Sequence, residues 1–409
     1  QQRLWFLARL EPDNAVYNIP LVLHFSGALD THALAGALDD VVRRHEVLRT
    51  RFPVRDGVAE QEIGDDAPDI IVADPITTDP SDVEEKIAEI AWEPFRLADA
   101  PQLRARLLQT GRADYILVLV VHHVIADGAS MGPLARDVIA GYRARSEGES
   151  ADFGKLAVQY ADYALWQRAV LGDPRSRDSI AGRQLAFWRE TLDGAADLID
   201  LPLDHLRPAT QSKVSRNHQF SIGAGLAAEL DEFALEHGVS LFMLLHAMWL
   251  VLLNRLSGSA DITIGTPYAG RGERALDDLV GMFVNSLALR TRFGVEDAFT
   301  DLLAVVKETD LAAISNADVP FEMVVEQLDL PRTDSHAPVF QVALALQDHT
   351  DSSFELPGVA IEFEDHPRTL TDYDLSVTFI ESWPAGDRSG HYLRGNVDYA
   401  ADLFDPRSV

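Results

Sequence analysis

Two adjacent histidines, followed at short range by an aspartate and a glycine, form the pattern in this sequence with the clearest capacity for chemistry. His122 and His123 are followed, after three residues, by Asp127 and Gly128. An imidazole has a reference pKa of about 6.5 and an α-amine one of about 8, so a histidine can accept a proton from an amine near neutral pH. By spacing alone, such a pair more often packs in a core or lies exposed without a function.

The histidine pair follows a stretch that predicts a buried strand. Residues 115–121 are a continuous apolar, β-branched run, which is typical of a strand covered on both faces. Because side chains alternate along a strand, His122 and His123 must face opposite sides. Gly128 permits a tight turn into a predicted helix at 131–145. The reactive groups therefore lie on a loop that leaves a rigid strand, where functional residues often occur.

Metal binding by the pair is disfavoured. Adjacent side chains on a strand diverge, the chain has no cysteine, and it contains no HExxH motif. We therefore expect no metal at this site.

Strands and helices alternate along the rest of the chain. We predict strands at 16–25, 103–109, 217–222, 261–264 and 339–347, and helices at 31–48, 184–192, 240–256 and 299–315. Asp30 or Thr31 is placed to cap a helix, and Ser81 with Glu84 has the spacing of a capping box. Tyr163 and Trp166, three residues apart on a helical segment, are expected in the core. A polar stretch rich in turn residues, 171–178, separates two blocks, which predicts an α/β fold with two lobes, 1–175 and 176–409.

The amino-acid composition argues against nucleic acid and membrane as binding partners. The net charge is −30 and the pI is about 4.6, whereas a nucleic-acid surface needs clustered basic residues. The absence of cysteine excludes a disulfide framework and fits a cytoplasmic protein, and we see no secretory leader. The longest apolar stretch, 241–253, contains His246 and is too short to span a bilayer, so we expect a buried helix and no membrane partner.

At this point the sequence resembles a known family. The segment from His122 to Gly128 resembles the HHxxxDG signature of condensation domains of nonribosomal peptide synthetases. Six further segments resemble other motifs of that family, in the expected order: 1–7, 44–50, 160–168, 264–286, 318–322 and 373–376. The resemblance covers essentially the whole chain.

The resemblance implies a fold and a reaction. The fold is a V-shaped pseudo-dimer of two chloramphenicol-acetyltransferase-like lobes around a central tunnel, with crossover segments at about 266–275 and 345–380. The reaction, typical of antibiotic or siderophore biosynthesis, joins a donor peptidyl thioester to an acceptor aminoacyl thioester. No cofactor is bound directly, because donor and acceptor carrier domains supply the 4'-phosphopantetheine arms. Adenylation or epimerisation domains are the implied neighbours.

The resemblance also implies roles for residues of the motif. His123 is the catalytic histidine, either as a base or as a group that orients the amine. His122 points away and supports the fold. Asp127 is structural and pairs with an arginine of the second motif, Arg49 or, as the fallback, Arg51. The backbone N–H of Gly128 is a candidate oxyanion donor.

Five further residues are candidates to line the tunnel or bind substrate. Many family members have tryptophan where this chain has Ala129, which would reshape the site. The other four are Ser130, Pro267, Asn285 and Ser376. Asn285 could instead bond the backbone within a buried strand, and Pro267 is expected in a loop that crosses between the lobes.

Two alternatives to amide formation remain. An enzyme of the same fold could use a hydroxyl acceptor and form an ester, or the domain could be a docking module for a partner enzyme without catalysis. Residues 171–185 resemble domains that accept a donor ending in a D-residue, so we favour that donor class over an all-L one.

Overall fold

The chain forms two compact units in a computed structural model, which describes residues 1–65, 74–99, 101–330, 333–348, 355–356, 358–364, 370–383 and 391–409. Unit 1 comprises 1–170, 271–284 and 353–366, and unit 2 comprises 171–270, 285–352 and 367–409. Each unit is built around one six-stranded sheet with helices, so the predicted α/β fold with two lobes is confirmed. The division after Val170 lies a few residues before the one that we predicted at 175.

Unit 1 contains a mixed sheet in the order β13-β14-β1-β8-β7-β6. Its strands are β1 (Asn18–Gly27), β6 (Ile76–Thr77), β7 (Leu103–Gln109), β8 (Asp114–His122), β13 (Glu355–Leu356) and β14 (Val359–Glu364). Only the β6–β7 pair is parallel among these described strands. Two small antiparallel pairs lie outside the sheet, β2 (Thr50–Arg51) with β5 (Glu62–Ile63) and β3 (Val54–Arg55) with β4 (Val58–Ala59).

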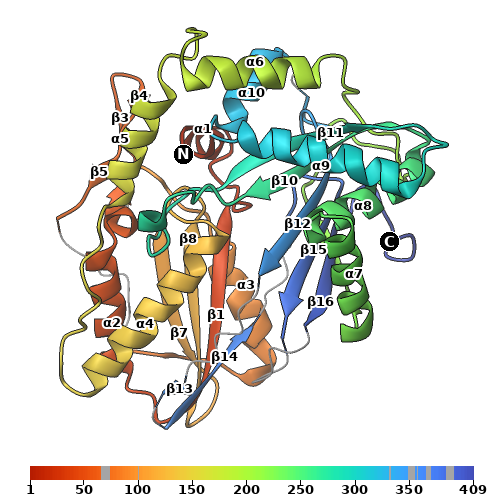
Figure 1. Ribbon diagram of the computed structural model, residues 1–409. Helices are drawn as coiled ribbons and strands as arrows, with labels where there is room; N and C mark the ends of the chain where they lie inside the picture. The colour runs from red at the N-terminus through yellow and green to blue at the C-terminus, as the bar shows by residue number, and fades with distance from the viewer. Residues whose placement is uncertain are drawn as a thin grey trace. The chain divides into compact units, whose positions relative to one another are not determined.

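The central strand β8 is buried on both faces, as its apolar run predicts. Leu117, Leu119 and Val121 belong to one hydrophobic cluster, and Ile116, Val118 and Val120 belong to another. The first cluster includes side chains of α2 (Thr31–Arg44) and α4 (Met131–Ser146), and the second includes side chains of α3 (Val83–Ala91) (Figure 1). Helices therefore cover both faces and fix the strand that carries the histidine pair.

Local capping of the helices follows the sequence in one case and departs from it in another. The carboxylate of Asp30 accepts hydrogen bonds from the first turn of α2, as predicted. The capping box that we predicted at Ser81 and Glu84 does not form. The hydroxyl of Ser81 donates to Asp79 at 2.8 Å, so this carboxylate caps the short turn at 80–82 and α3 begins at Val83.

The remaining helices of unit 1 are α1 (Gln2–Leu10) and most of α5 (Tyr160–Leu171). Tyr163 on α5 is buried, as expected, but Trp166 is 49% exposed, so its placement in the core was wrong. Only one side of α5 is buried. Tyr163 lies on that side, whereas Trp166, three residues later, faces outward.

Unit 2 has a mixed sheet in the order β11-β10-β12-β15-β16-β9. Its strands are β9 (Ser215–Ile222), β10 (Asp261–Tyr268), β11 (Asn285–Arg292), β12 (Val342–Asp348), β15 (Leu375–Ser382) and β16 (Tyr392–Ala400). Its helices are α6 (Ile180–Leu192), α7 (Ala224–Glu236), α8 (Leu241–Ser257), α9 (Phe299–Ser315) and α10 (Phe321–Leu328). Pro267 therefore lies in β10 and not in a crossing loop.

The apolar helix α8 is largely buried in the core of unit 2, as its sequence predicts. His246 on α8 contacts the buried Asp310 on α9 at 3.0 Å. Within the described ranges, no single helix is long and apolar enough to cross a membrane, although the bent pair of α7 and α8 passes the same test by length and composition.

Two segments from the C-terminal half of the chain belong to unit 1. Residues 271–284 follow β10 and precede β11, both strands of unit 2, and residues 353–366 contribute β13 and β14 to the sheet of unit 1. We expected crossover segments at about 266–275 and 345–380. Parts of the second range, 349–354, 357 and 365–369, lie outside the described residues.

Candidate functional site

The candidate site begins where β8 ends, at the histidine pair. His122 is 2% exposed and continues the row formed by Ile116, Val118 and Val120. Its Nδ1 accepts a hydrogen bond from the backbone N–H of Val124 at 3.0 Å. Burial, with a smaller contribution from His123, lowers the pKa of His122 to about 3. His122 is therefore a neutral side chain that supports the turn.

His123 is the half-buried member of the pair. Its backbone N–H donates to the carbonyl of Tyr17 at 2.7 Å, which fastens the start of the turn to the residue before β1. The side chain of Gln1 donates to the carbonyl of Val124 at 2.7 Å. Because Val124, Ile125 and Ala126 are all fully buried, the backbone around His123 is firmly held, while His123 itself is half-buried with its Nδ1 atom shielded from solvent.

Asp127 closes the turn from a buried position, at 1% exposed. Its Oδ1 accepts from the backbone N–H and the hydroxyl of Ser130 at 2.9 and 2.7 Å. Its Oδ2 accepts from the backbone N–H groups of Phe283 and Val284 at 2.9 and 3.2 Å. A buried carboxylate needs such partners. Asp127 thus joins the turn after β8 to the 271–284 segment within unit 1.

The charged partner of Asp127 is Arg271. Its Nη2 lies 3.2 Å from Asp127 Oδ1, while its Nη1 donates to the carbonyls of Leu276 and Leu279 at 2.5 and 2.9 Å. Its guanidinium carbon lies 4.2 Å from the centre of the Phe283 ring, a cation–π arrangement. One arginine therefore folds the 271–284 segment on itself and ties it to the motif.

We predicted that Asp127 pairs with Arg49 or Arg51, and this prediction is wrong. Arg49 donates to the carbonyl of Gly64 and lies 3.6 Å from the carboxylate of Glu46. Arg51 pairs with Glu62, which is its direct partner across the β2–β5 ladder. Both guanidinium groups are thus engaged locally. The sequence did not reveal Arg271, because it lies 144 positions from Asp127 and only the path of the chain brings them together.

Ser130 is completely buried and contacts both the turn and the 271–284 segment. Its hydroxyl lies 2.9 Å from Arg271 Nη2, and 3.1 and 2.8 Å from the backbone nitrogen and oxygen of Gly281. With Asp127 it forms a reciprocal capping box at the short turn 128–130. We predicted Ser130 as a substrate-lining residue, and its burial is inconsistent with that role.

The 271–284 segment also packs closely against α5. The hydroxyl of Tyr160 donates to the carbonyl of Met282 at 2.8 Å, and burial raises the pKa of this hydroxyl, which keeps it a donor. A Cβ atom on Gly281 would lie 2.2 Å from the Tyr160 ring and 2.6 Å from that of Phe283. Only glycine fits at this position without displacing an aromatic ring.

The remaining sequence candidates lie at different places. Gly128 and Ala129 are exposed beside the turn in unit 1, and the oxyanion role of Gly128 stays a prediction. Pro267, Asn285 and Ser376 are on strands of unit 2. The amide of Asn285 is hydrogen-bonded to backbone groups through both of its polar atoms. Its Nδ2 donates to the carbonyls at 317 and 319, and its Oδ1 accepts from the N–H groups at 286 and 321.

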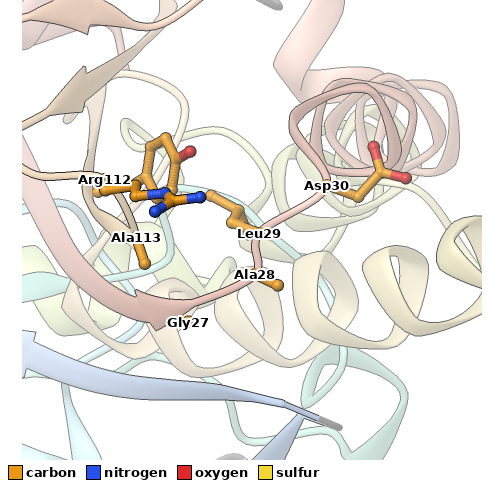
Figure 2. A pocket seen from close by; sticks show the side chains of 7 residues that line it. Gly27, Ala28, Leu29, Asp30, Arg112 and Ala113 are labelled. Atoms are coloured by element: carbon orange, nitrogen blue, oxygen red, sulfur yellow. The ribbon is translucent and has the colours of Figure 1, made fainter.

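One surface pocket of unit 1 lies away from this site. It measures about 510 Å³ and is lined by residues 27–30, 112, 113 and 115, among them Arg112 and Leu29 (Figure 2). The pocket therefore lies at the start of β8, and His122 lies at its end. The nine residues of this strand span about 30 Å. Chemistry at the histidine pair does not involve it. In the part of the chain that the structure describes, no three His, Cys, Asp or Glu side chains are grouped to hold a metal ion.

Comparison with known proteins gives a family. The family model described as Condensation domain matches residues 1–409. The probable non-canonical nonribosomal peptide synthetase CymA of Salinispora arenicola is 43% identical over 410 residues, which are 100% of this chain and 5% of that protein. The dimodular nonribosomal peptide synthase of Bacillus subtilis is 41% identical over 99% of this chain and 17% of its own length. The chain thus spans a small part of these relatives.

Solved structures show the same fold. The X-domain from teicoplanin biosynthesis is 32% identical, with a TM-score of 0.91, and the match covers 100% of this chain and 90% of that one. The complex of the X-domain and OxyB matches with a TM-score of 0.90. The first condensation domain of the calcium-dependent antibiotic synthetase matches at 17% identity with a TM-score of 0.77, covering 100% of this chain and 91% of that one, which supports the fold alone.

Proposed function

This chain belongs to the condensation-domain family of nonribosomal peptide synthetases, and from that premise we propose that it catalyses acyl transfer from a donor thioester to an acceptor amine. The observation that carries the proposal is the intact motif at the end of β8. The half-buried His123 lies on a turn that is hydrogen-bonded at its start to the carbonyl of Tyr17 and at its end, through Asp127, to the backbone N–H of Phe283. A docking module would not need a precisely held imidazole.

The proposed step forms one bond and breaks another. The acceptor nitrogen attacks the donor carbonyl carbon, and the resulting tetrahedral intermediate releases the donor arm as a thiol. The proton lost by the amine ends on the departing sulfur. His123 either relays that proton or orients the amine. His122 does not compete as a base, because its pKa is about 3 and its Nδ1 faces the backbone N–H of Val124.

The proposed partners are the donor and acceptor carrier domains, which present the substrates on phosphopantetheine arms. Members of this family act on carrier-tethered substrates, and the relatives are much longer than this chain, which spans between 5% and 37% of three of them. We place adenylation or epimerisation domains beside this one in the parent synthetase. The cytoplasmic location stays a prediction.

Docking of a partner enzyme is a second candidate function. Two solved structures that are 32% identical to this chain are of the teicoplanin X-domain, one of them in complex with OxyB. This likeness favours docking more directly than the synthetase relatives favour catalysis, because each relative's name describes a whole synthetase, of which this chain spans only 5% or 17%. No observation favours an ester-forming enzyme.

One competition experiment separates these functions. A peptidyl-loaded donor carrier is mixed with equal amounts of an aminoacyl-loaded and a hydroxyacyl-loaded acceptor carrier, and intact-protein mass spectrometry follows the peptide. Transfer to the aminoacyl carrier supports amide formation, and transfer to the hydroxyacyl carrier supports ester formation. If folded protein transfers nothing but binds OxyB from teicoplanin biosynthesis in a titration, the docking function replaces our proposal.

A further inference from the structure

The hydroxyl of Ser130 is the point where the turn that carries His123 meets the 271–284 segment. A serine hydroxyl has one proton to donate and two lone pairs that accept. Here the proton has two acceptors in reach, the carboxylate of Asp127 at 2.7 Å, which makes a charge-assisted bond, and the carbonyl of Gly281 at 2.8 Å. The lone pairs accept from Arg271 Nη2 at 2.9 Å and from the backbone N–H of Gly281 at 3.1 Å. The hydrogen-bonding capacity of this hydroxyl is thus fully used.

The same hydroxyl holds the end of the turn. The backbone N–H of Asp127 lies 3.3 Å from Ser130 Oγ, and the backbone N–H of Ser130 donates to Asp127 Oδ1 at 2.9 Å. The start of the turn is held separately, by the bond from the N–H of His123 to the carbonyl of Tyr17. His123 therefore lies between two anchors, and Ser130 belongs to the second of them.

From this geometry we propose that Ser130 is a positioning residue, which sets the place of the His123 imidazole through Asp127 and the turn. Ser130 is 0% exposed, so its hydroxyl does not reach substrate. Loss of the hydroxyl removes one bond from Asp127, one from Arg271 and one from Gly281 at the same time. The end of the turn then loses its register with the 271–284 segment. A displacement of about 1 Å at a reactive group can lower a rate by about 100-fold.

This inference rests on the proposed acyl transfer, and a double-mutant cycle tests it. Ser130→Ala should lower the single-turnover transfer rate by about 10- to 100-fold, with the KM for both carriers unchanged. In the His123→Ala background, Ser130→Ala should change the residual rate by less than about twofold, because its effect passes through His123. An equal loss in both backgrounds overturns the inference.

Two controls separate positioning from general damage. Ser130→Cys keeps the shape but forms weaker hydrogen bonds, so it should fold and still lose rate. Thr50→Val removes another buried hydroxyl of unit 1, one that bonds the carbonyl of Glu46, and should leave the rate unchanged. If Ser130→Cys transfers as fast as the unmodified protein, the hydroxyl does not position the site.

A spectroscopic measurement tests the inference without catalysis. With ¹⁵N-labelled histidine, Ser130→Cys should shift the imidazole signals of His123 while those of His246, buried in unit 2, stay in place. If the unmodified protein transfers nothing, the proposed function fails and this comparison still decides the positioning role. Unchanged signals of His123 would refute it.

Discussion

Replacing Asp127 by asparagine tests how the motif is supported, because the change keeps the shape and removes the charge. The carboxylate accepts from Ser130 and Arg271 through one oxygen, and from the backbone at 283 and 284 through the other. An amide can satisfy only one of these sides. In either orientation its NH₂ group faces N–H donors inside a buried site.

The expected loss in the free energy of unfolding of Asp127→Asn follows from these contacts. Removing one partner of a buried charged pair costs about 3–5 kcal/mol, and the remaining amide oxygen recovers part of this, so we expect a loss of about 3 kcal/mol. For a folding unit of about 150–250 residues, 1 kcal/mol corresponds to about 2–4 °C in melting temperature. Asp127→Asn should therefore melt about 6–12 °C below the unmodified protein and lose transfer activity.

The assay compares calorimetric melting with turnover measured well below the transition. Asp278→Asn is the matched control, because Asp278 lies in the same segment and its pair with Arg136 is exposed to solvent. An exposed pair contributes about 0–1 kcal/mol, so this variant should melt within about 4 °C of the unmodified protein. If Asp127→Asn melts like the unmodified protein and yet loses turnover, Asp127 acts in the chemistry and our structural account of it is wrong.

Three further outcomes are expected. In chemical denaturation, Gly281→Ala should lower the free energy of unfolding by about 1–3 kcal/mol, because the new Cβ clashes with Tyr160. Gly132→Ala is the control: a Cβ there meets nothing within 4 Å, so the variant should be neutral or stabilising. Asn285→Ala should cost about 2–3 kcal/mol in the same experiment, because it leaves backbone groups unpaired; a neutral result would contradict its structural role. Because the unfolded state binds a proton on His122 below about pH 6.5 and the folded state only below about 3, this residue lowers stability as pH falls between those values. Its imidazole signals in NMR should show the neutral Nε2–H form down to about pH 4, and a titration midpoint near 6.5 would contradict the burial argument.

Much of the frame around the site could be predicted from sequence, because the signals are local. The apolar run before the histidine pair predicted a strand buried on both faces, and alternation along a strand predicted that the two histidines diverge. In the structure His122 is buried and His123 is half-buried. The helix after Asp30 was also correct, since a cap depends on residues within one turn.

The support of the site could not be predicted, because it depends on contacts across the chain. Arg271 is one of 35 basic residues, and no spacing rule links it to Asp127. Asn285 left two interpretations open, and only the positions of its neighbours' backbone groups selected one. Even locally, Ser81 does not cap a helix, because Asp79 caps the short turn 80–82 that contains Ser81 and α3 begins only at Val83.

The most direct test of the central claim is the single-turnover transfer of a peptidyl group between loaded carriers, by the unmodified protein and by His123→Ala, with both shown to melt at the same temperature. We predict transfer by the unmodified protein and a loss of about 100-fold or more for His123→Ala. Equal rates for the two proteins, or no transfer by the folded unmodified protein across several donors and acceptors, would contradict the assignment of acyl transfer to this site.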